Sequence, residues 1–190
     1  KGAGIDPNSA DTDGWTALHF AAQNDHLDVV RYLVEEAKAD PNKAMDDGWT
    51  PILIAAHNGH LDVVRCLVEE AKADPNKANN NGMTPIYVAA RNDNLNIVEH
   101  LVEKAEADPN IANNDGWTPL HIAAEEGNLN IIQYLVSKGA DPTKPDNNGM
   151  TPIMVAAKYG RVNVVRYLVE EAKVQDPNKA NNDGETPIHV

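Results

Sequence analysis

The fold of this chain is decided by the stretch Asn113-Asn114-Asp115-Gly116-Trp117-Thr118-Pro119-Leu120-His121-Ile122-Ala123-Ala124. Asp115-Gly116 supplies the positive φ that a tight hairpin turn requires. Thr118 has the hydroxyl of a helix N-cap, and Pro119 suits the first helical position because its missing N–H costs nothing there. The stretch therefore predicts a hairpin-like turn that leads into a short helix with small side chains.

The same stretch recurs along the chain at a nearly constant spacing. The threonines that begin the short helix are Thr16, Thr50, Thr84, Thr118, Thr151 and Thr186. Consecutive members of this set lie 34, 34, 34, 33 and 35 residues apart. The first five are followed by a pair of alanines, namely Ala21-Ala22, Ala55-Ala56, Ala89-Ala90, Ala123-Ala124 and Ala156-Ala157. A fixed period in this range indicates a repeat array rather than one globular core.

Each repeat continues, after a second turn, into a longer helical pattern. In the second repeat this pattern runs from Leu61 to Glu70. Its apolar residues at i, i+3, i+6 and i+7 are Leu61, Val64, Leu67 and Val68. This spacing predicts one buried stripe. Because one helix pair cannot bury both of its helices, we expect neighbouring repeats to stack on each other.

These combined motifs identify a known repeat. Gly116-Trp-Thr-Pro-Leu-His-Ile-Ala-Ala124 is followed by Gly127-Asn128-Leu129, Leu135-Val136 and Gly139-Ala140-Asp141-Pro142. This pattern resembles the ankyrin repeat, and the resemblance covers essentially the whole chain. It implies an all-α ankyrin-repeat solenoid of stacked helix-turn-helix units with β-hairpin-like turns between them. We expect a single array over 1–190, with units at about 1–10 (partial), 11–44, 45–78, 79–112, 113–145, 146–180 and 181–190 (partial).

The chain departs from the family pattern in its links and at its ends. Only Gly139-Ala140-Asp141 keeps the usual Gly-Ala-Asp after the second helix, whereas links such as Ala71-Lys72-Ala73-Asp74 are longer. We expect the added residue to extend the helix slightly or to bulge the link. Residues 1–8 resemble the tail of a preceding repeat, and the chain stops inside a first helix. Because neither end reads as a polar capping unit, we expect a segment of a longer protein.

Composition and charge exclude several classes of partner. The net charge of -13 argues against nucleic acid as the main partner, because phosphate binding relies on Lys and Arg. The same charge disfavours an anionic membrane surface, and no apolar run is long enough for a membrane span. The single cysteine, Cys66, excludes an internal disulfide and favours an intracellular, cytoplasmic location.

No arrangement of residues in the sequence supports catalysis, a cofactor or a small-molecule substrate. His57 and His60 are spaced for a shared metal, but no Cys or further His completes the set. In the ankyrin family the histidine of Thr-Pro-Leu-His hydrogen-bonds around the threonine and the neighbouring turn, which implies a structural role for His19, His121 and His189. Cys66 shares its place in the repeat with Tyr32, His100, Tyr134 and Tyr167, so we interpret it as a packing residue.

The resemblance also implies where a partner docks. Ankyrin repeats usually bind proteins on the concave side, at the hairpin tips and the outer end of the first helix. Carried over by position, the candidate partner-binding residues are Asp13, Trp15, Gln23, Asp46, Asp47, Trp49, His57, Asn81, Met83, Arg91, Asp115, Trp117, Glu125, Glu126, Met150, Lys158 and Tyr159.

One column of this set has the composition of a binding hot spot, because it places a large apolar side chain just before each helix-start threonine. Its members are Trp15, Trp49, Met83, Trp117 and Met150. Each of these side chains could instead pack against a neighbouring hairpin and stiffen the row. The acidic residues around them favour a protein partner with a basic and apolar contact surface. Two alternatives remain: a structural spacer in a larger assembly, or the targeting arm of an enzyme encoded outside this segment.

Overall fold

A computed structural model describes residues 6–172, 174 and 179–186 and divides the chain into two compact units. Unit 1 comprises residues 1–107 and unit 2 comprises residues 108–190. The described residues form helices joined by turns, with a single isolated antiparallel bridge between Ala10 and Thr16. The predicted all-α class with stacked helix pairs is therefore confirmed.

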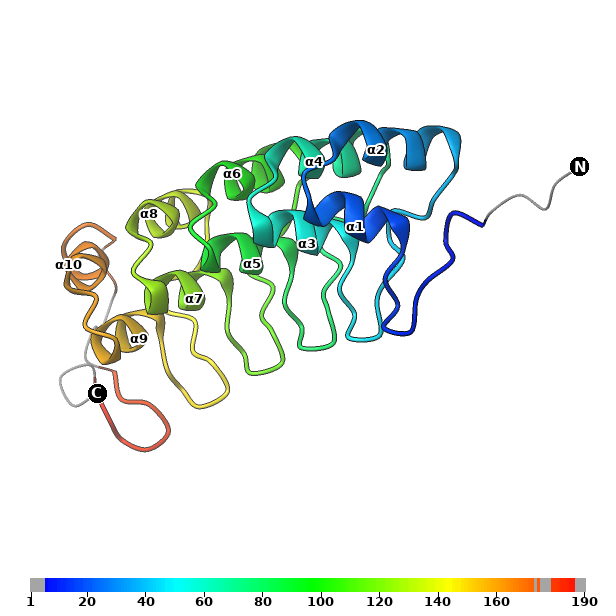
Figure 1. The fold of residues 1–190 in the computed structure, drawn as a ribbon. Coiled ribbons are helices and arrows are strands. Elements are labelled where there is room, and N and C mark those ends of the chain that lie inside the picture. The colour runs from blue at the N-terminus through cyan, green and yellow to red at the C-terminus, as the bar shows by residue number, and fades with distance from the viewer. Residues whose placement is uncertain (1–5, 173, 175–178, 187–190) are drawn as a thin grey trace, which may run out of the picture. The chain divides into compact units, whose positions relative to one another are not determined.

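Unit 1 consists of three helix pairs whose first helices lie side by side, with the second helices in a layer behind them (Figure 1). The first helices are α1 (Ala17–Gln23), α3 (Pro51–Asn58) and α5 (Pro85–Arg91). The second helices are α2 (Leu27–Arg31) with η1 (Tyr32–Glu36), α4 (Leu61–Arg65) with η2 (Cys66–Glu70), and α6 (Leu95–Lys104). The hairpins project beyond the first helices, away from the second layer.

Unit 2 repeats this arrangement with two helix pairs. The pairs are α7 (Pro119–Glu126) with α8 (Leu129–Ser137), and α9 (Pro152–Lys158) with α10 (Val162–Glu170). Helix α7 packs on α9, and α8 packs on α10. Each first helix also packs on the second helix of its own repeat, so that the same two layers form as in unit 1.

The first helices begin as the sequence predicts. Thr50 and Thr118 are N-caps with extended backbone angles, and a proline follows each at the first helical position. The threonine hydroxyls have different roles. Thr84 Oγ1 accepts a hydrogen bond from the Tyr87 amide at 3.3 Å, whereas Thr16 Oγ1 lies 2.8 Å from His19 Nδ1. In the part of the chain that the structure describes, the buried hydroxyl of Thr50 has no partner.

The core is built from small and aliphatic side chains between the two layers. The Ala-Ala pairs are buried apart from Ala157, which is half-buried. The predicted stripe of the second repeat is buried at Val64 and Leu67 and half-buried at Leu61 and Val68. Val63 in α4 and Cys66 in η2 are buried as well, because α4 packs against both α2 and α6, and η2 packs against α2 and α3. The buried face of this helix is therefore wider than the predicted stripe.

The lengthened links are accommodated at the helix ends by a wider last turn, which is π-helical in η1 and η2. In the standard link the Ala140 amide donates to the carbonyl of Leu135, five residues earlier, and Gly139 has a φ of 89°. In the longer links the equivalent bonds span six residues: Ala39 to Leu33, Ala73 to Leu67, and Ala107 to Leu101. Lys38, Lys72 and Glu106 take the left-handed conformation in place of glycine. The extra residue thus widens the last turn, as the expected bulge, and these alanines remain buried.

Candidate protein-binding surface

Most of the predicted partner-binding residues are accessible on the hairpins and first helices. Those with exposed side chains in unit 1 are Asp13, Gln23, Asp46, Asp47, His57, Asn81 and Arg91. Those in unit 2 are Asp115, Glu126, Lys158 and Tyr159. The half-buried ones are Trp15, Trp49, Met83, Trp117 and Glu125. Met150 is buried, with 9% of its surface exposed, so it offers a partner little area.

The hairpins are held by an aspartate or asparagine at their first position. In the first hairpin, Asp11 Oδ1 accepts the amides of Asp13 at 3.0 Å and Trp15 at 2.8 Å. The Asp11 amide donates to the Trp15 carbonyl at 2.9 Å, which closes the loop as a hairpin. Such side-chain bonds to the backbone fix the tip before any partner arrives. The same anchor position is occupied by Asn79, Asn113, Asp146 and Asn181, each of which accepts two backbone amides.

Consecutive hairpins within a unit are also tied together. The Asp46 amide donates to the Asp13 carbonyl at 3.3 Å, and the Asn80 amide donates to the Asp47 carbonyl at 3.1 Å. Gly48 lies at this junction with a φ of 87°, and a Cβ there would come within 2.5 Å of the Asn80 nitrogen. These ties give the hairpin row of unit 1 a fixed spacing.

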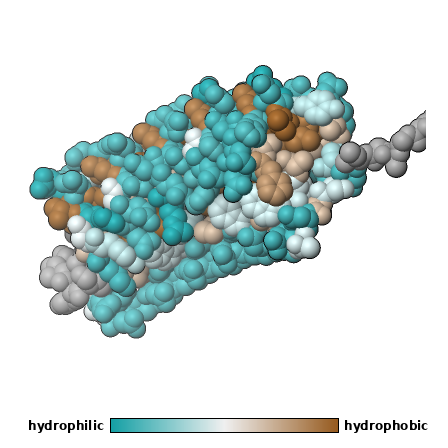
Figure 2. Space-filling view, viewed as in Figure 1, coloured by the Kyte–Doolittle hydropathy of each residue, from teal (hydrophilic) through white to brown (hydrophobic). Residues whose placement is uncertain are grey.

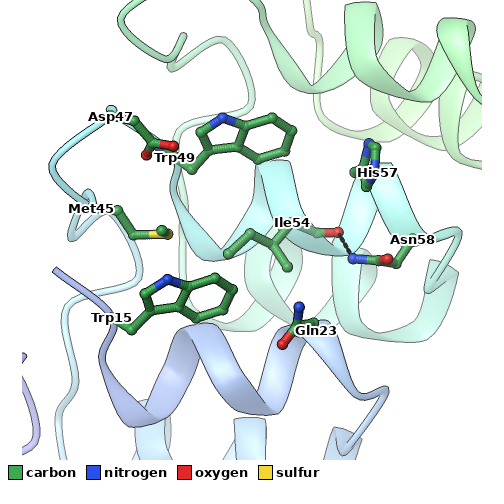
Figure 3. A pocket seen from close by; sticks show the side chains of 8 residues that line it. All are labelled: Trp15, Gln23, Met45, Asp47, Trp49, Ile54, His57 and Asn58. Atoms are coloured by element: carbon green, nitrogen blue, oxygen red, sulfur yellow. Dashed lines mark hydrogen bonds between the residues drawn. The ribbon is translucent and has the colours of Figure 1, made fainter. Parts of the chain in front are cut away.

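A pocket of about 280 Å³ opens in unit 1 between the first two hairpins and the helices that follow them. Its lining residues are Trp15, Gln23, Met45, Asp47, Trp49, Ile54, His57 and Asn58. Figure 3 shows the two indole rings on either side of Met45 and Ile54, with His57 and Asn58 at the far end of α3. In Figure 2, pale and tan side chains gather among hydrophilic ones on this part of unit 1. The pocket brings together five of the predicted site residues.

Ring contacts fix the two indoles of the pocket. Trp15 stacks on Phe20 with centroids 4.9 Å apart, and Trp49 meets His57 edge-on at 5.6 Å. The His57 ring is itself held by the side-chain amide of Asn92, 3.1 Å from Nδ1. Both tryptophans therefore pack against their own repeats, and each remains partly accessible.

Met45 is the exception among the hairpin anchors, and it lines the pocket. Because a methionine side chain has no oxygen for the hairpin amides, the Trp49 amide instead donates to Asp47 Oδ1 at 3.2 Å. The substitution places an apolar, adaptable side chain where the other described hairpins have a polar anchor. Sequence reasoning missed both Met45 and Ile54. Met45 could have been found by comparing the six anchor positions of the hairpins, because the other five are aspartate or asparagine.

Unit 2 uses the equivalent tryptophan differently. The Trp117 indole N–H donates to Asp146 Oδ2 at 2.9 Å, and Asp146 is the anchor of the next hairpin. Trp15 has no such bond in the described structure, because the next anchor after it is Met45. The Asp146 side chain thus satisfies the indole and its own hairpin together, whereas the corresponding position in unit 1 stays open to a ligand.

Three of the predicted residues of unit 2 gather at the ends of its first helices. The carboxylate of Glu125, as a hydrogen-bond acceptor and a negative charge, raises the pKa of the Tyr159 hydroxyl, and Glu126 adds to this effect. Arg161 Nε donates to the Glu125 carbonyl at 2.6 Å. The Arg161 bond ties the end of α7 to the start of the second helix of the next repeat.

The histidine three residues after the helix-start threonine has the predicted structural role in both units, at His19 and His121. His19 Nδ1 accepts the Thr16 amide at 3.1 Å, while Nε2 lies 3.3 Å from the carbonyl of Trp49 in the next hairpin. His121 makes the equivalent contacts to Thr118 and to the carbonyl of Met150. Burial lowers the pKa of both rings. The third histidine of this type, His189, lies outside the described residues.

Two further interpretations concern metals and Cys66. Over the described residues there is no group of three His, Cys, Asp or Glu side chains placed to hold a metal ion. The Cys66 side chain is buried, and burial together with the charge of Glu70 raises the pKa of its thiol to about 11. A thiol that stays protonated is a poor nucleophile, which agrees with the packing role predicted for it.

In the described part of the chain, none of the helices has the length and apolar composition needed to cross a membrane. Three proteins with ankyrin repeats match one stretch of 35 residues, which is 18% of this chain. They are the Notch-regulated ankyrin repeat-containing proteins of Xenopus tropicalis and Xenopus laevis and the B form of Danio rerio, each 51% identical there. The match covers 31% of the two Xenopus proteins and 32% of the Danio protein, so the chain spans under a third of their length.

Family models match nearly the entire chain. A model described as ankyrin repeats in three copies matches residues 2–79 and 71–146, and one described as ankyrin repeats in many copies matches residues 135–190. Ankyrin repeats are generally protein-binding modules and are typically non-catalytic. The chain belongs to the ankyrin repeat family.

Proposed function

We propose that this chain is a scaffold that binds a protein partner through its hairpin tips and first helices. The observation that carries the proposal is the pocket of unit 1, where Trp15, Trp49 and Met45 form an accessible apolar centre within a polar rim. Central aromatic anchors surrounded by polar groups are the usual make-up of a binding hot spot. The proposal includes an intracellular setting, supported by the single free cysteine.

The hairpins support this proposal because they are ordered without a partner. Their tips are fixed by side-chain anchors and by the bonds between neighbouring hairpins. A surface that is already ordered loses little conformational entropy on binding. Asp13, Asp46 and Asp47 are exposed around the pocket, and they favour a partner whose contact surface is basic as well as apolar.

The proposal is tested by capturing proteins from a native lysate with the parent chain and with Trp49→Ala. We expect a captured protein to lose at least about tenfold in affinity for the variant, as for a hot-spot tryptophan. Tyr32→Ala is the matched control, because Tyr32 is an aromatic side chain with 63% of its surface exposed on the second-helix layer. Thermal unfolding of each variant checks that it is folded.

The ionic strength of the binding buffer tests the electrostatic part of the proposal. Raising it should weaken the captured complex, because exposed charges are screened by salt. Equal capture by the parent and Trp49→Ala would move the binding site to another surface. No specific capture by either would favour the structural spacer.

A further inference from the structure

We infer that the pocket of unit 1 is a receptor for one arginine side chain of the partner, presented on an extended peptide segment. This inference rests on the proposed function and specifies the anchor that the surface takes. It follows from three features of the pocket: a carboxylate oxygen with no partner among the described residues, two partly exposed indole rings, and two indole N–H groups that likewise have no partner there.

The carboxylate is that of Asp47. It is the acidic group among the lining residues, and none of them is a lysine or arginine. Asp47 Oδ1 accepts the Trp49 amide, whereas Oδ2 accepts no hydrogen bond from any residue that the structure describes. The Asp47 carbonyl is held by the Asn80 amide at 3.1 Å, so the hairpin that carries the carboxylate is fixed in place. The pocket thus presents a negative charge with no cation to balance it.

The walls beside this carboxylate suit a flat cation. A guanidinium group stacks on aromatic faces and pairs with carboxylates through its planar set of donors. Trp15 and Trp49 are both half-buried, and Met45 and Ile54 supply apolar surface for the methylene groups of a long side chain. An arginine side chain has both parts, an apolar stem and a charged planar end. Lysine lacks the planar end and stacks less well.

The indole N–H groups are the reason for inferring that the arginine is carried on a peptide. Within the described residues, neither Trp15 Nε1 nor Trp49 Nε1 has a hydrogen-bond partner, whereas Trp117 Nε1 donates to Asp146. Covering these two donors with an apolar surface would leave them unpaired, which costs free energy. A peptide that carries the arginine brings carbonyl oxygens, which accept hydrogen bonds from such donors.

The inference is tested by titrating the protein with N-acetyl-arginine N-methylamide and recording the indole N–H signals by NMR. We expect the signals of Trp15 and Trp49 to shift with a dissociation constant of about 1 mM, the weak range for a single side chain. The signal of Trp117 should stay in place. The citrulline analogue has the same shape without the charge and should bind at least about fivefold more weakly, as should the lysine analogue.

Two matched variants locate the charge that is responsible. Asp47→Asn keeps an oxygen for the Trp49 amide and should weaken arginine binding about two- to fivefold, the usual range for an exposed ion pair. Asp115→Asn makes the same change at the equivalent hairpin position of unit 2 and should leave binding unchanged. Equal effects of the two variants would show a general response to net charge and would overturn the inference.

Other outcomes separate this inference from the proposed function. If the Trp15 and Trp49 signals do not move, or if citrulline or lysine binds as tightly as arginine, the inference is wrong even where a protein is captured through Trp49. If the arginine analogue binds as expected but no protein depends on Trp49, the arginine receptor stands and the proposed scaffold function fails.

Discussion

The hairpin sides of the two units share one scaffold but treat their tryptophans in opposite ways. In unit 2 Asp146 anchors its hairpin and accepts the Trp117 indole N–H, so two hairpin amides and the indole are satisfied by one side chain. In unit 1 the equivalent anchor is Met45, the Trp15 indole N–H has no partner among the described residues, and a pocket opens beside it. For Trp15 and Trp117, the residue at the next anchor thus decides whether the indole N–H is satisfied. Trp49, whose next anchor is Asn79, makes no such bond in the described structure, so a polar anchor alone is not sufficient. The following experiments would break or sharpen this contrast.

The largest effect is expected from Asp146→Met, which gives unit 2 the anchor of unit 1. The change removes the acceptor of two backbone amides, one of them the buried amide of Met150, and of the Trp117 indole. We expect the free energy of unfolding to fall by about 2–3 kcal/mol, because buried donors are left unsatisfied. Urea unfolding measures the loss, and hydrogen exchange at the Met150 amide localises it.

The control for this variant is Asn148→Met, at the tip of the same hairpin. The Asn148 side chain is exposed and makes no hydrogen bond within the described structure. A loss of stability as large in the control as in Asp146→Met would refute the role given to the anchor. The converse change, Met45→Asp, should protect the Trp15 indole N–H from exchange and stabilise unit 1 by about 1 kcal/mol.

Lowering the pH is expected to have a smaller effect, a loss of stability that is common to both units. Burial lowers the pKa of His19 and His121, and Nδ1 of each must stay unprotonated to accept a threonine amide. Between the folded and unfolded pKa values, the histidines bind more protons in the unfolded chain than in the folded one. The stability that the two neutral rings contribute is therefore complete above a pH of about 6.5 and is lost as the pH falls through the folded pKa. The melting temperature should therefore drop between a pH of about 7 and about 5.

His121→Leu provides the comparison for the acid effect, because it copies Leu53 at the equivalent position of the second repeat. This variant should show a flatter dependence of melting temperature on pH over the same range. An unchanged dependence in the variant would assign the acid effect to carboxylates instead.

The smallest effects are expected at the links, where the units differ again. Gly139→Ala in unit 2 should cost about 1 kcal/mol, because the φ of 89° disfavours any side chain although nothing lies within 4 Å of the new Cβ. Lys38→Gly in unit 1 should instead stabilise by about 0.5 kcal/mol, because Lys38 has a φ of 62°. Denaturant titration of the two variants should give changes of opposite sign, and a stabilising Gly139→Ala would contradict the explanation.

Most of the fold could be predicted from the sequence because its signals are local. The Thr-Pro pair seen at Thr118 and Pro119 begins a helix at 50, 84, 118 and 151, and the spacing of the threonines indicates the number of repeats. The π-helical turn could not be predicted, since an extra residue such as Lys72 is equally compatible with a longer loop. Only the hydrogen bond from Ala73 to Leu67 shows where the residue goes.

The site was predicted in position but not in detail. The repeat pattern places Trp15, Trp49 and Trp117 in one column, and it therefore predicts the same environment for all three. The difference between Trp15 and Trp117 depends on the residue about 30 positions later, Met45 for Trp15 and Asp146 for Trp117, which the fold brings next to each indole. Analysing each repeat by itself cannot show which anchor residue lies next to which indole.

The π-helical turns have a consequence for how such a gene can change. Within unit 1 the additional residue is taken up before the buried alanines at positions 39 and 73, so each link keeps its buried contact although it is one residue longer than the Gly139 link. Gain or loss of one codon at this point is therefore a nearly silent event for the protein. Copies of unequal length can recombine there during duplication, and the chain can lengthen without the repeats losing their match.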